Sequence, residues 1–235
     1  MDLTDTASGI FHVEFFGPGV IAAFSGRNYD NLKREEFLTK LKLDSSRLVM
    51  VKQVHGSTVL TVKAQDPSLL DVPADGLITK AEDLALGIRT ADCVPVFFWD
   101  PVRKVAGIAH GGWRGVKDGL MSRMLNVFER DFGTDLKDLK IVFGPSIRKC
   151  CYEVGKEFLG YFPGFYHAKD ANKGYLDLIA VLRGRFIKRG VLAQGIYDTG
   201  LCTVCENKKF FSYRAEKNTQ QRILSVICID SRRAS

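Results

Sequence analysis

Apolar positions along the chain gather into short segments of strand length, separated by turn residues. The first two segments are 10–16 and 20–25, and Gly17-Pro18-Gly19 between them is typical of a turn. Asp100-Pro101 likewise predicts the tight turn of a hairpin. The other segments for which this pattern predicts strands are 47–53, 58–62, 84–90, 94–99, 104–109, 140–143, 196–197, 210–213 and 223–229.

Four segments carry apolar residues at helical spacing. The first is 31–43, for which Asp30 is a suitable N-cap. The second runs from Val116 to Phe132 and precedes a glycine that ends it. A short helix after Glu153 and a longer one over 176–189 follow.

Strands and helices mix without a regular βαβ alternation. The sequence therefore predicts an α+β fold, a single compact domain over residues 1–235 with mixed β-sheets flanked by helices. A hydrophobic content of 46% with 26% charged residues is ordinary for a globular protein. A chain of 235 residues is also long enough to bury a substantial core.

Charge and hydropathy narrow the classes of partner. No apolar run is long enough to cross a bilayer, and the acidic N-terminus lacks a signal peptide, so we expect a cytoplasmic protein with no membrane partner. A net charge of +7 and a pI near 9.1 favour anionic partners. Lysine and arginine are spread along the chain without an RNA-binding or zinc-finger signature, so we expect no nucleic-acid partner. No obligate protein partner is evident either.

The six cysteines of a chain without a signal peptide are expected to be reduced thiols. Adjacent Cys150 and Cys151 cannot readily bridge each other without strain. Cys202 and Cys205 have the spacing of a redox motif or of half a zinc site. No matching second pair lies near them in the sequence, so we interpret them as structural or incidental.

Three other residues point to a metal. His55, Cys93 and His110 each lie in a phrase punctuated by glycine or proline, close to the end of a predicted strand. Two imidazoles and one thiolate suit a zinc ion that keeps a fourth position open for water or substrate. Each residue taken alone is more often a buried core residue than a ligand. Asp92, beside Cys93, has two possible roles: it could orient a metal ligand or a bound water, or it could be an ordinary turn residue.

Seven phrases in order along the chain resemble the YfiH, or laccase-domain, family, over about residues 24 to 229. The phrases are Gln53–Gly56, Ala74–Thr79, Thr90–Pro95, Ala109–Gly115, Gly144–Ile147, Cys150–Val154 and Phe210–Arg214. The resemblance implies a YfiH-like fold and zinc ligands His55, Cys93 and His110. It also implies a zinc-dependent purine nucleoside phosphorylase that deaminates adenosine, in a family first described as laccase-like polyphenol oxidases.

Phosphorolysis of adenosine, inosine, guanosine or methylthioadenosine would use inorganic phosphate as co-substrate and release a free base and ribose 1-phosphate. Cations that hold phosphate and groups that stabilise the departing base lower its barrier. The expected catalytic residues are Arg114, Asp75 and Glu153, the two carboxylates being candidate proton shuttles for deamination. The expected substrate-binding residues are Arg27, Trp113, Phe211 and Tyr213.

Three alternatives remain open. The first is a copper-dependent, laccase-like polyphenol oxidase, since copper can substitute for zinc, although copper oxidases need more than the four histidines present. The second is a non-catalytic binding module that zinc stabilises. The third is a thiol hydrolase in which Cys93 works with a histidine base, a role that metal binding by Cys93 would largely exclude.

Overall fold

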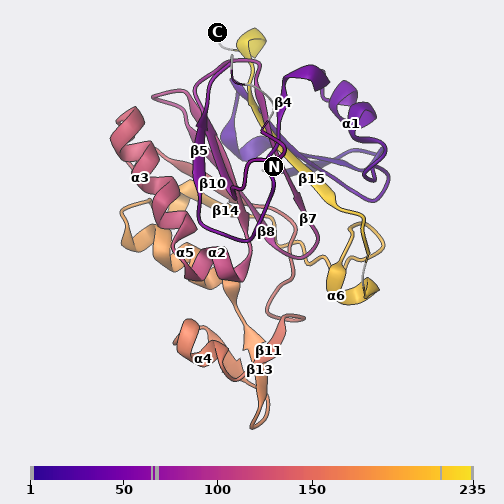
Figure 1. Ribbon diagram of the computed structural model, residues 1–235, viewed down its shortest axis with the longest axis vertical. Helices are drawn as coiled ribbons and strands as arrows, with labels where there is room; N and C mark the ends of the chain where they lie inside the picture. The colour runs from indigo at the N-terminus through magenta and orange to yellow at the C-terminus, as the bar shows by residue number, and fades with distance from the viewer. Residues whose placement is uncertain (1–2, 65, 67–68, 218, 234–235) are drawn as a thin grey trace.

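The computed structural model describes residues 3–64, 66, 69–217 and 219–233, and its strands form three sheets (Figure 1). The first sheet has the order β1-β2-β3-β15-β7-β4. Its strands are β1 (Leu3–Asp5), β2 (Ile10–Val13), β3 (Val20–Ser25), β15 (Ile223–Ile229), β7 (Ala85–Thr90) and β4 (Leu48–Val49).

The second sheet has the order β14-β10-β8-β9-β6-β5. Its strands are β14 (Ile196–Asp198), β10 (Lys140–Phe143), β8 (Val94–Asp100), β9 (Val105–Gly111), β6 (Gly76–Thr79) and β5 (Val59–Val62). A small third sheet joins β11 (Glu153–Gly155), β13 (Lys173–Leu176) and β12 (Tyr166–Ala168). In Figure 1 the parts of this third sheet that are labelled project from the main body together with α4 (Phe158–Tyr161).

Helices cover the outer faces of the two large sheets. α1 (Arg34–Lys40) packs Phe37 and Leu38 against the first sheet. The outer face of the second sheet carries α2 (Trp113–Lys117), α3 (Leu120–Phe132) and α5 (Leu178–Lys188). The sixth helix, α6 (Tyr213–Glu216), lies at the lower right in Figure 1, on the other side of the molecule from α3 and α5.

Strand β8 shows why the second sheet lies in the middle of the molecule. All seven of its residues are buried, because the strand is covered on both faces. Phe97 packs into the core between the two sheets, whereas Phe98 packs on the other face against the rings of Phe128 in α3 and Phe186 in α5. Burial on both faces explains the nearly continuous apolar run of this strand.

The predicted α+β class with mixed sheets and flanking helices is confirmed. Most neighbouring strands are antiparallel, but β4 pairs with β7, β5 with β6, and β10 with β14 in parallel. Within the described residues, no helix is long and apolar enough to span a bilayer.

The segment after Gly115 forms two helices rather than the predicted single one. α2 ends at Lys117 and α3 begins at Leu120. Gly119 between them has a φ of +90°, a left-handed value that breaks a helix and that glycine adopts without a Cβ clash. The apolar period continues through the break, so the pattern did not reveal it.

Residues 210–213 do not form the predicted strand. The hydroxyl of Ser212 accepts the backbone N–H of Ala215 and so caps the N-terminus of α6. Phe210 and Phe211 before it are buried in the core between the two sheets. An apolar aromatic pair fits a buried loop as well as a strand, and the serine cap decides between them.

Other boundaries differ because local hydrogen bonds end the elements early. β2 ends at Val13, where a 3₁₀ turn over Glu14–Phe16 replaces the rest of the predicted strand. Asp30 accepts from two backbone N–H groups just before α1, so it caps the preceding turn instead of the helix. β4 forms only two residues of the strand predicted over 47–53. The short helix expected after Glu153 is α4, and the strand β11 precedes it. The strands β6, β12 and β13 were not predicted from the sequence.

Candidate metal centre and cavity

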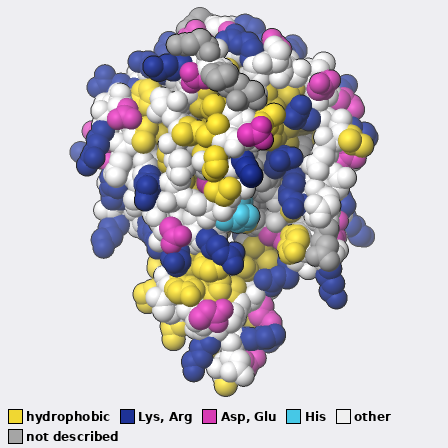
Figure 2. Space-filling view, viewed as in Figure 1, with side chains coloured by type: hydrophobic (Ala, Val, Ile, Leu, Met, Phe, Trp, Pro, Cys, Tyr) yellow, Lys and Arg dark blue, Asp and Glu magenta, His cyan; other side chains and the backbone are white. Residues whose placement is uncertain are grey.

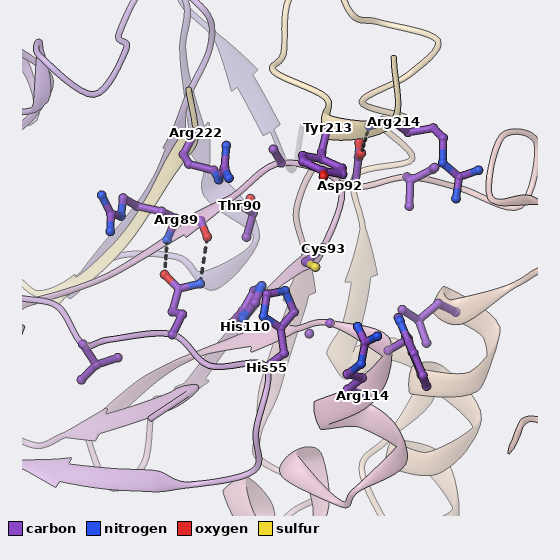
Figure 3. Close-up of a pocket in the computed structure, with 18 of the residues that line it drawn as sticks. His55, Arg89, Thr90, Asp92, Cys93, His110, Arg114, Tyr213, Arg214 and Arg222 are labelled. Carbon is purple, nitrogen blue, oxygen red and sulfur yellow. Dashed lines mark hydrogen bonds between the residues drawn. The ribbon is translucent and has the colours of Figure 1, made fainter. Parts of the chain in front are cut away.

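Two histidines and one cysteine that are far apart in the sequence meet in one place. His55, Cys93 and His110 each offer one ligand atom, and these atoms lie within 4.8 Å of one another. The two imidazole rings cross almost at right angles, with centroids 4.6 Å apart. Figure 3 shows all three side chains converging beneath the same cavity.

The three residues meet because four strand ends lie at one edge of the second sheet. β5, β6 and β8 begin at this edge, and the antiparallel strand β9 ends there. His55 precedes β5, Cys93 immediately precedes β8, and His110 lies near the end of β9, opposite Pro95. The sheet therefore brings together residues that have no shared local motif.

Asp75, just before β6, holds two of the three residues in position. It is fully buried. One carboxylate oxygen accepts from Nδ1 of His110 at 2.7 Å and from the backbone N–H of His55 at 3.0 Å. The other oxygen accepts from the N–H groups of Val54 and Gly56. Asp75 thus fixes the His110 ring with Nδ1 engaged and leaves Nε2 for a ligand.

The backbone around the centre is tightly constrained. His55 has a φ of +58° and Asp92 a φ of +89°, left-handed conformations that non-glycine residues rarely adopt. A Cβ at Gly112 would lie 3.0 Å from Cδ2 of His55 and 3.3 Å from Sγ of Cys93. Gly115 is needed for the same reason, because a Cβ there would meet the carbonyl oxygen of Gly56.

Cys93 and His110 form an electrostatic pair. Burial opposes ionisation of Cys93, but the positive charge and hydrogen bond of His110 prevail and lower the pKa of the thiol to about 6. Burial likewise disfavours the charged form of His110, while the Cys93 thiolate and the Asp75 carboxylate raise the pKa of the imidazole to about 9. Cys93 is therefore held as a thiolate at neutral pH, the form that binds metals.

This set of donors fits a zinc ion. Two imidazoles and a thiolate are ligands that zinc prefers, and a shell of three protein ligands is typical of catalytic rather than structural zinc. Within the described residues, the group has these three members, and all three line the cavity above it. A fourth position can therefore be reached from the cavity.

The cavity has a volume of about 810 Å³, within the range of small-molecule sites. Positive charge surrounds it, because its lining includes Lys52, Arg89, Arg114, Arg214 and Arg222. In Figure 3, Arg89 and Arg222 lie on one side of the metal-ligand group, and Arg114 and Arg214 lie on the other. Figure 2 shows a histidine in the hollow with Lys and Arg side chains around it.

Three of the expected substrate and catalytic residues line the cavity: Arg114, Trp113 and Tyr213. The guanidinium of Arg114 lies over the Trp113 ring at 4.4 Å, and Trp113 also packs against Phe158. The side chain of Tyr213 is half exposed at the opposite wall.

Arg27 and Phe211 are not among the described residues that line the cavity. They contact each other instead, with the guanidinium 4.6 Å from the ring centroid. Arg27 also forms an ion pair with Glu216 at 2.5 Å, at the end of α6. Because α6 begins at Tyr213, these two residues support a wall of the cavity and do not face it.

The two expected proton shuttles are also placed away from the cavity. Glu153 lies on β11 and forms ion pairs with Lys169 and Lys173. Asp75 lies behind His110, with both oxygens engaged as described above. The geometry makes Asp75 a positioning residue and gives Glu153 a role in joining strands of the small sheet.

Asp92 joins the centre to the late part of the chain. Its side chain accepts from the Thr203 hydroxyl at 2.6 Å and from the backbone N–H of Arg214 at 2.7 Å. Both carboxylate oxygens are thus engaged, and neither solvates its own turn. Ile147 also donates its N–H to the carbonyl oxygen of Asp92.

Arg89, Arg214 and Arg222 also line the cavity, although none of them was predicted as a site residue from the sequence. Arg89 gives a signal in the sequence, since it is the one charged residue in the apolar strand that leads to Cys93. Arg214 closes one of the phrases that carried the family resemblance. Arg222 lies just before β15 and has no comparable signal.

The interpretation of Cys202 and Cys205 as an isolated pair was incomplete. The fold places them beside Cys150 and Cys151, and the four sulfurs lie within 4.8 Å of one another. Cys150 lies 52 residues before Cys202 in the sequence, so local spacing did not reveal the second pair.

Comparison with known proteins gives one family and a consistent set of relatives. A family model described as "Multi-copper polyphenol oxidoreductase laccase" matches residues 30–230. The purine nucleoside phosphorylase of Borreliella burgdorferi is 35% identical over 77% of this chain and 79% of that protein. The protein named adenosine deaminase RL5, from an unknown prokaryotic organism, is 30% identical over 74% of this chain and 72% of that protein.

Two further similarities extend this picture. The purine nucleoside phosphorylase LACC1 of Mus musculus is 31% identical over 72% of this chain, which spans only 40% of that longer protein. The crystal structure of the hypothetical protein YfiH of Bacillus licheniformis aligns with a TM-score of 0.91 at 27% identity, over 97% of this chain and 99% of that one. The YfiH-like fold is therefore confirmed.

Replacing Asp75 with asparagine is expected to weaken zinc retention by about 10- to 100-fold, because the amide cannot accept from all four N–H groups. The amide nitrogen of Asp75→Asn would oppose at least one of those donors, which also destabilises the 54–56 loop. Zinc affinity is measured by chelator competition, with Asp118→Asn on the surface as the matched control. Full zinc retention with loss of activity would instead make Asp75 a proton shuttle.

Metal-free protein is expected to hold Cys93 as a thiolate down to a pH of about 6. Since this pKa lies below the value of about 8.5 for an unfolded cysteine, ionisation of Cys93 stabilises the fold fully above about pH 8.5. That contribution is lost as the pH falls through about 6. The measurement is the ultraviolet thiolate absorbance of wild type minus that of Cys93→Ser, and a transition near 8.5 would contradict the pairing with His110.

Proposed function

The chain belongs to the multi-copper polyphenol oxidoreductase laccase family, and from that premise we propose that it is a zinc-dependent purine nucleoside phosphorylase. It cleaves adenosine, and also inosine, guanosine and methylthioadenosine, with phosphate to give the free base and ribose 1-phosphate. Deamination of adenosine is a side activity. The names of the relatives from Borreliella burgdorferi and of RL5 support both parts of the proposal.

The observation that carries the proposal is the joint presence of a three-ligand metal centre and several cations around one cavity. A nucleoside and an inorganic phosphate together need a site that is both large and positively charged. The cavity of about 810 Å³ offers such a volume, and four arginines and one lysine line it. A structural metal site requires neither the cavity nor the cations.

The arginines are suited to bind phosphate, because the planar guanidinium group binds an oxyanion through two parallel hydrogen bonds. Arg114 is the strongest candidate, since it lies in the first turn of α2, only four residues after His110. Fixing the phosphate beside the sugar raises its effective concentration at the anomeric carbon. Tyr213, whose half-exposed side chain lines the cavity, stacks on the purine.

A zinc ion bound by His55, Cys93 and His110 would supply Lewis-acid polarisation at its open position. The protein's contribution is to keep Cys93 ionised, through its contacts with His110 and His55, and to orient the His110 ring through its contact with Asp75. Among the described residues that line the cavity, Asp92 is the one carboxylate, and both of its oxygens are engaged. We therefore expect deamination, which needs a proton shuttle, to be the minor activity.

The family description favours a copper oxidase as the second candidate. A multicopper centre requires many imidazole ligands. The chain has four histidines, of which His55 and His110 reach the cavity, whereas His12 lies in β2 and His167 in β12. Two histidines at the cavity are enough for one metal ion in the centre but too few for a multicopper cluster.

Purified protein with zinc, phosphate and adenosine is expected to release adenine and ribose 1-phosphate at equal initial rates, with slower formation of inosine. Without phosphate, adenine release stops while inosine formation continues. Chromatography of the products measures both. His110→Ala is expected to abolish zinc retention and both activities, because it removes a ligand.

The matched control is His167→Ala, an exposed histidine outside the cavity, which is expected to keep both activities. Neither product from fully zinc-loaded protein would refute the proposal. Oxygen uptake with a phenol by copper-loaded protein would favour the oxidase instead.

Replacing Arg114 with glutamine is expected to raise the KM for phosphate by about tenfold or more, because the substitution removes a charge-assisted hydrogen bond to the phosphate. The KM for the nucleoside and the zinc content change much less. Lys117→Gln is the control, since Lys117 lies on the same helix but outside the lining. Steady-state kinetics at varied phosphate measures the effect, and an unchanged phosphate KM would remove Arg114 from the phosphate site.

A further inference from the structure

The four cysteines that the fold gathers outside the cavity form a compact group. Cys150 and Cys151 lie in the loop between β10 and β11, and Cys202 and Cys205 lie in the loop between β14 and α6. Their sulfurs are all within 4.8 Å of one another. Cys202 is buried, Cys151 is half-buried, and Cys150 and Cys205 are exposed.

The spacing of these sulfurs is that of ligands around one tetrahedral cation. With zinc–sulfur bonds of about 2.3 Å, neighbouring sulfurs in a tetrahedral shell lie about 3.8 Å apart. The sulfurs of Cys150 and Cys202 are 3.7 Å apart, those of Cys150 and Cys205 are 3.6 Å apart, and those of Cys151 and Cys205 are 3.4 Å apart. A disulfide would instead bring two sulfurs to about 2.05 Å, and all six cysteines are free.

The backbone of both loops is arranged for this purpose. The N–H groups of Cys151 and Tyr152 both donate to the carbonyl oxygen of Arg148, and this turn presents Cys150 and Cys151 to the same place. Burial opposes ionisation of Cys202, but the backbone N–H groups of Cys205, Arg148 and Val204 prevail and lower the pKa of its thiol. Such donors stabilise a thiolate that binds a metal, and a Cys-x-x-Cys turn commonly supplies them.

We propose that Cys150, Cys151, Cys202 and Cys205 bind a second zinc ion through four thiolates. Four sulfur ligands in a tetrahedral arrangement select zinc or iron, and four protein ligands leave no open position. The ion is structural, in contrast to the three-ligand centre in the cavity. It links two loops whose cysteines lie 52 to 55 residues apart in the pairs in contact.

The link joins the two loops that build one wall of the cavity. The first loop carries Tyr152, and the second leads to Tyr213 and Arg214, all of which line the cavity. The loops already touch through a β-bridge between Ser146 and Cys202 and through a hydrogen bond from Arg214 to the carbonyl oxygen of Cys151. A bound zinc ion adds a rigid connection beside these contacts and holds the aromatic and cationic groups in place.

Metal content tests the proposal on the intact chain. Wild type purified under reducing conditions is expected to hold two zinc ions per chain. The variant His110→Ala is expected to hold one zinc ion per chain, and so is Cys205→Ser. The double variant with both substitutions is expected to hold none. Cys228→Ala is the matched control with two, because Cys228 is buried in β15 and belongs to neither group.

Cobalt substitution identifies the ligands of the second ion. In His110→Ala, bound cobalt is expected to show the intense sulfur-to-metal charge-transfer and tetrahedral ligand-field bands of a four-thiolate site. Cys205→Ser combined with His110→Ala is expected to lose these bands. Chelation is expected to lower the Tm of His110→Ala but not that of the double variant.

Alkylation of wild type keeps the test decisive if the cysteine variants do not fold. Zinc is expected to protect Cys150, Cys151, Cys202 and Cys205 together, and a chelator to expose them together, with Cys228 unchanged. A folded His110→Ala chain that binds no zinc or cobalt would overturn the proposal. A native mass lower by two hydrogens per disulfide within the group, or iron in place of zinc, would also overturn it.

Discussion

The candidate site depends on one buried carboxylate. Asp75 has no exposed surface, and an ionised group in such a place must be neutralised by hydrogen bonds and opposite charge. Three consecutive backbone N–H groups, Val54 to Gly56, and the ring of His110 provide this compensation. Because the Asp75 carboxylate needs these hydrogen-bond donors, it joins the loop before β5 to the end of β9.

This requirement also explains a strained residue. The N–H groups of Val54, His55 and Gly56 can point to one carboxylate only if the chain curls around it, and His55 takes a φ of +58° in doing so. The cost of such a conformation is about 1–3 kcal/mol, and it persists because the surrounding contacts over-determine it. In return the His55 ring is presented to Cys93 and His110.

The class of the fold and most strands could be predicted from the sequence, since apolar strand patterns are local properties. The convergence of His55, Cys93 and His110 was predicted from their ligand types and from the family resemblance, because no local motif joins them. Sequence reasoning did not find the role of Asp75, because a carboxylate in a turn looks the same whether it faces solvent or four buried donors. It placed Glu153, Arg27 and Phe211 near substrate, because a phrase in the sequence does not say which face of an element a side chain takes.

Long-range pairing accounts for what else was missed. Cys150 and Cys151 have no visible relation to Cys202 and Cys205 until β10 and β14 pair in parallel and bring their following loops together. The small sheet of β11, β12 and β13 likewise arises from pairing between short segments with little apolar pattern of their own. Pairing partners are set by the whole fold, which a local window does not contain.

The lack of a side chain at Gly112 restricts how related chains can diversify. Any larger residue there would press on both His55 and Cys93, so the floor of the cavity has almost no freedom to change. The rim opposite consists of exposed, mostly polar residues such as Arg89 and Gln220, and is free of that restriction. New ligand preferences in descendants of this chain would thus arise by substitution of the rim residues, while Gly112 and the residues around it stay unchanged.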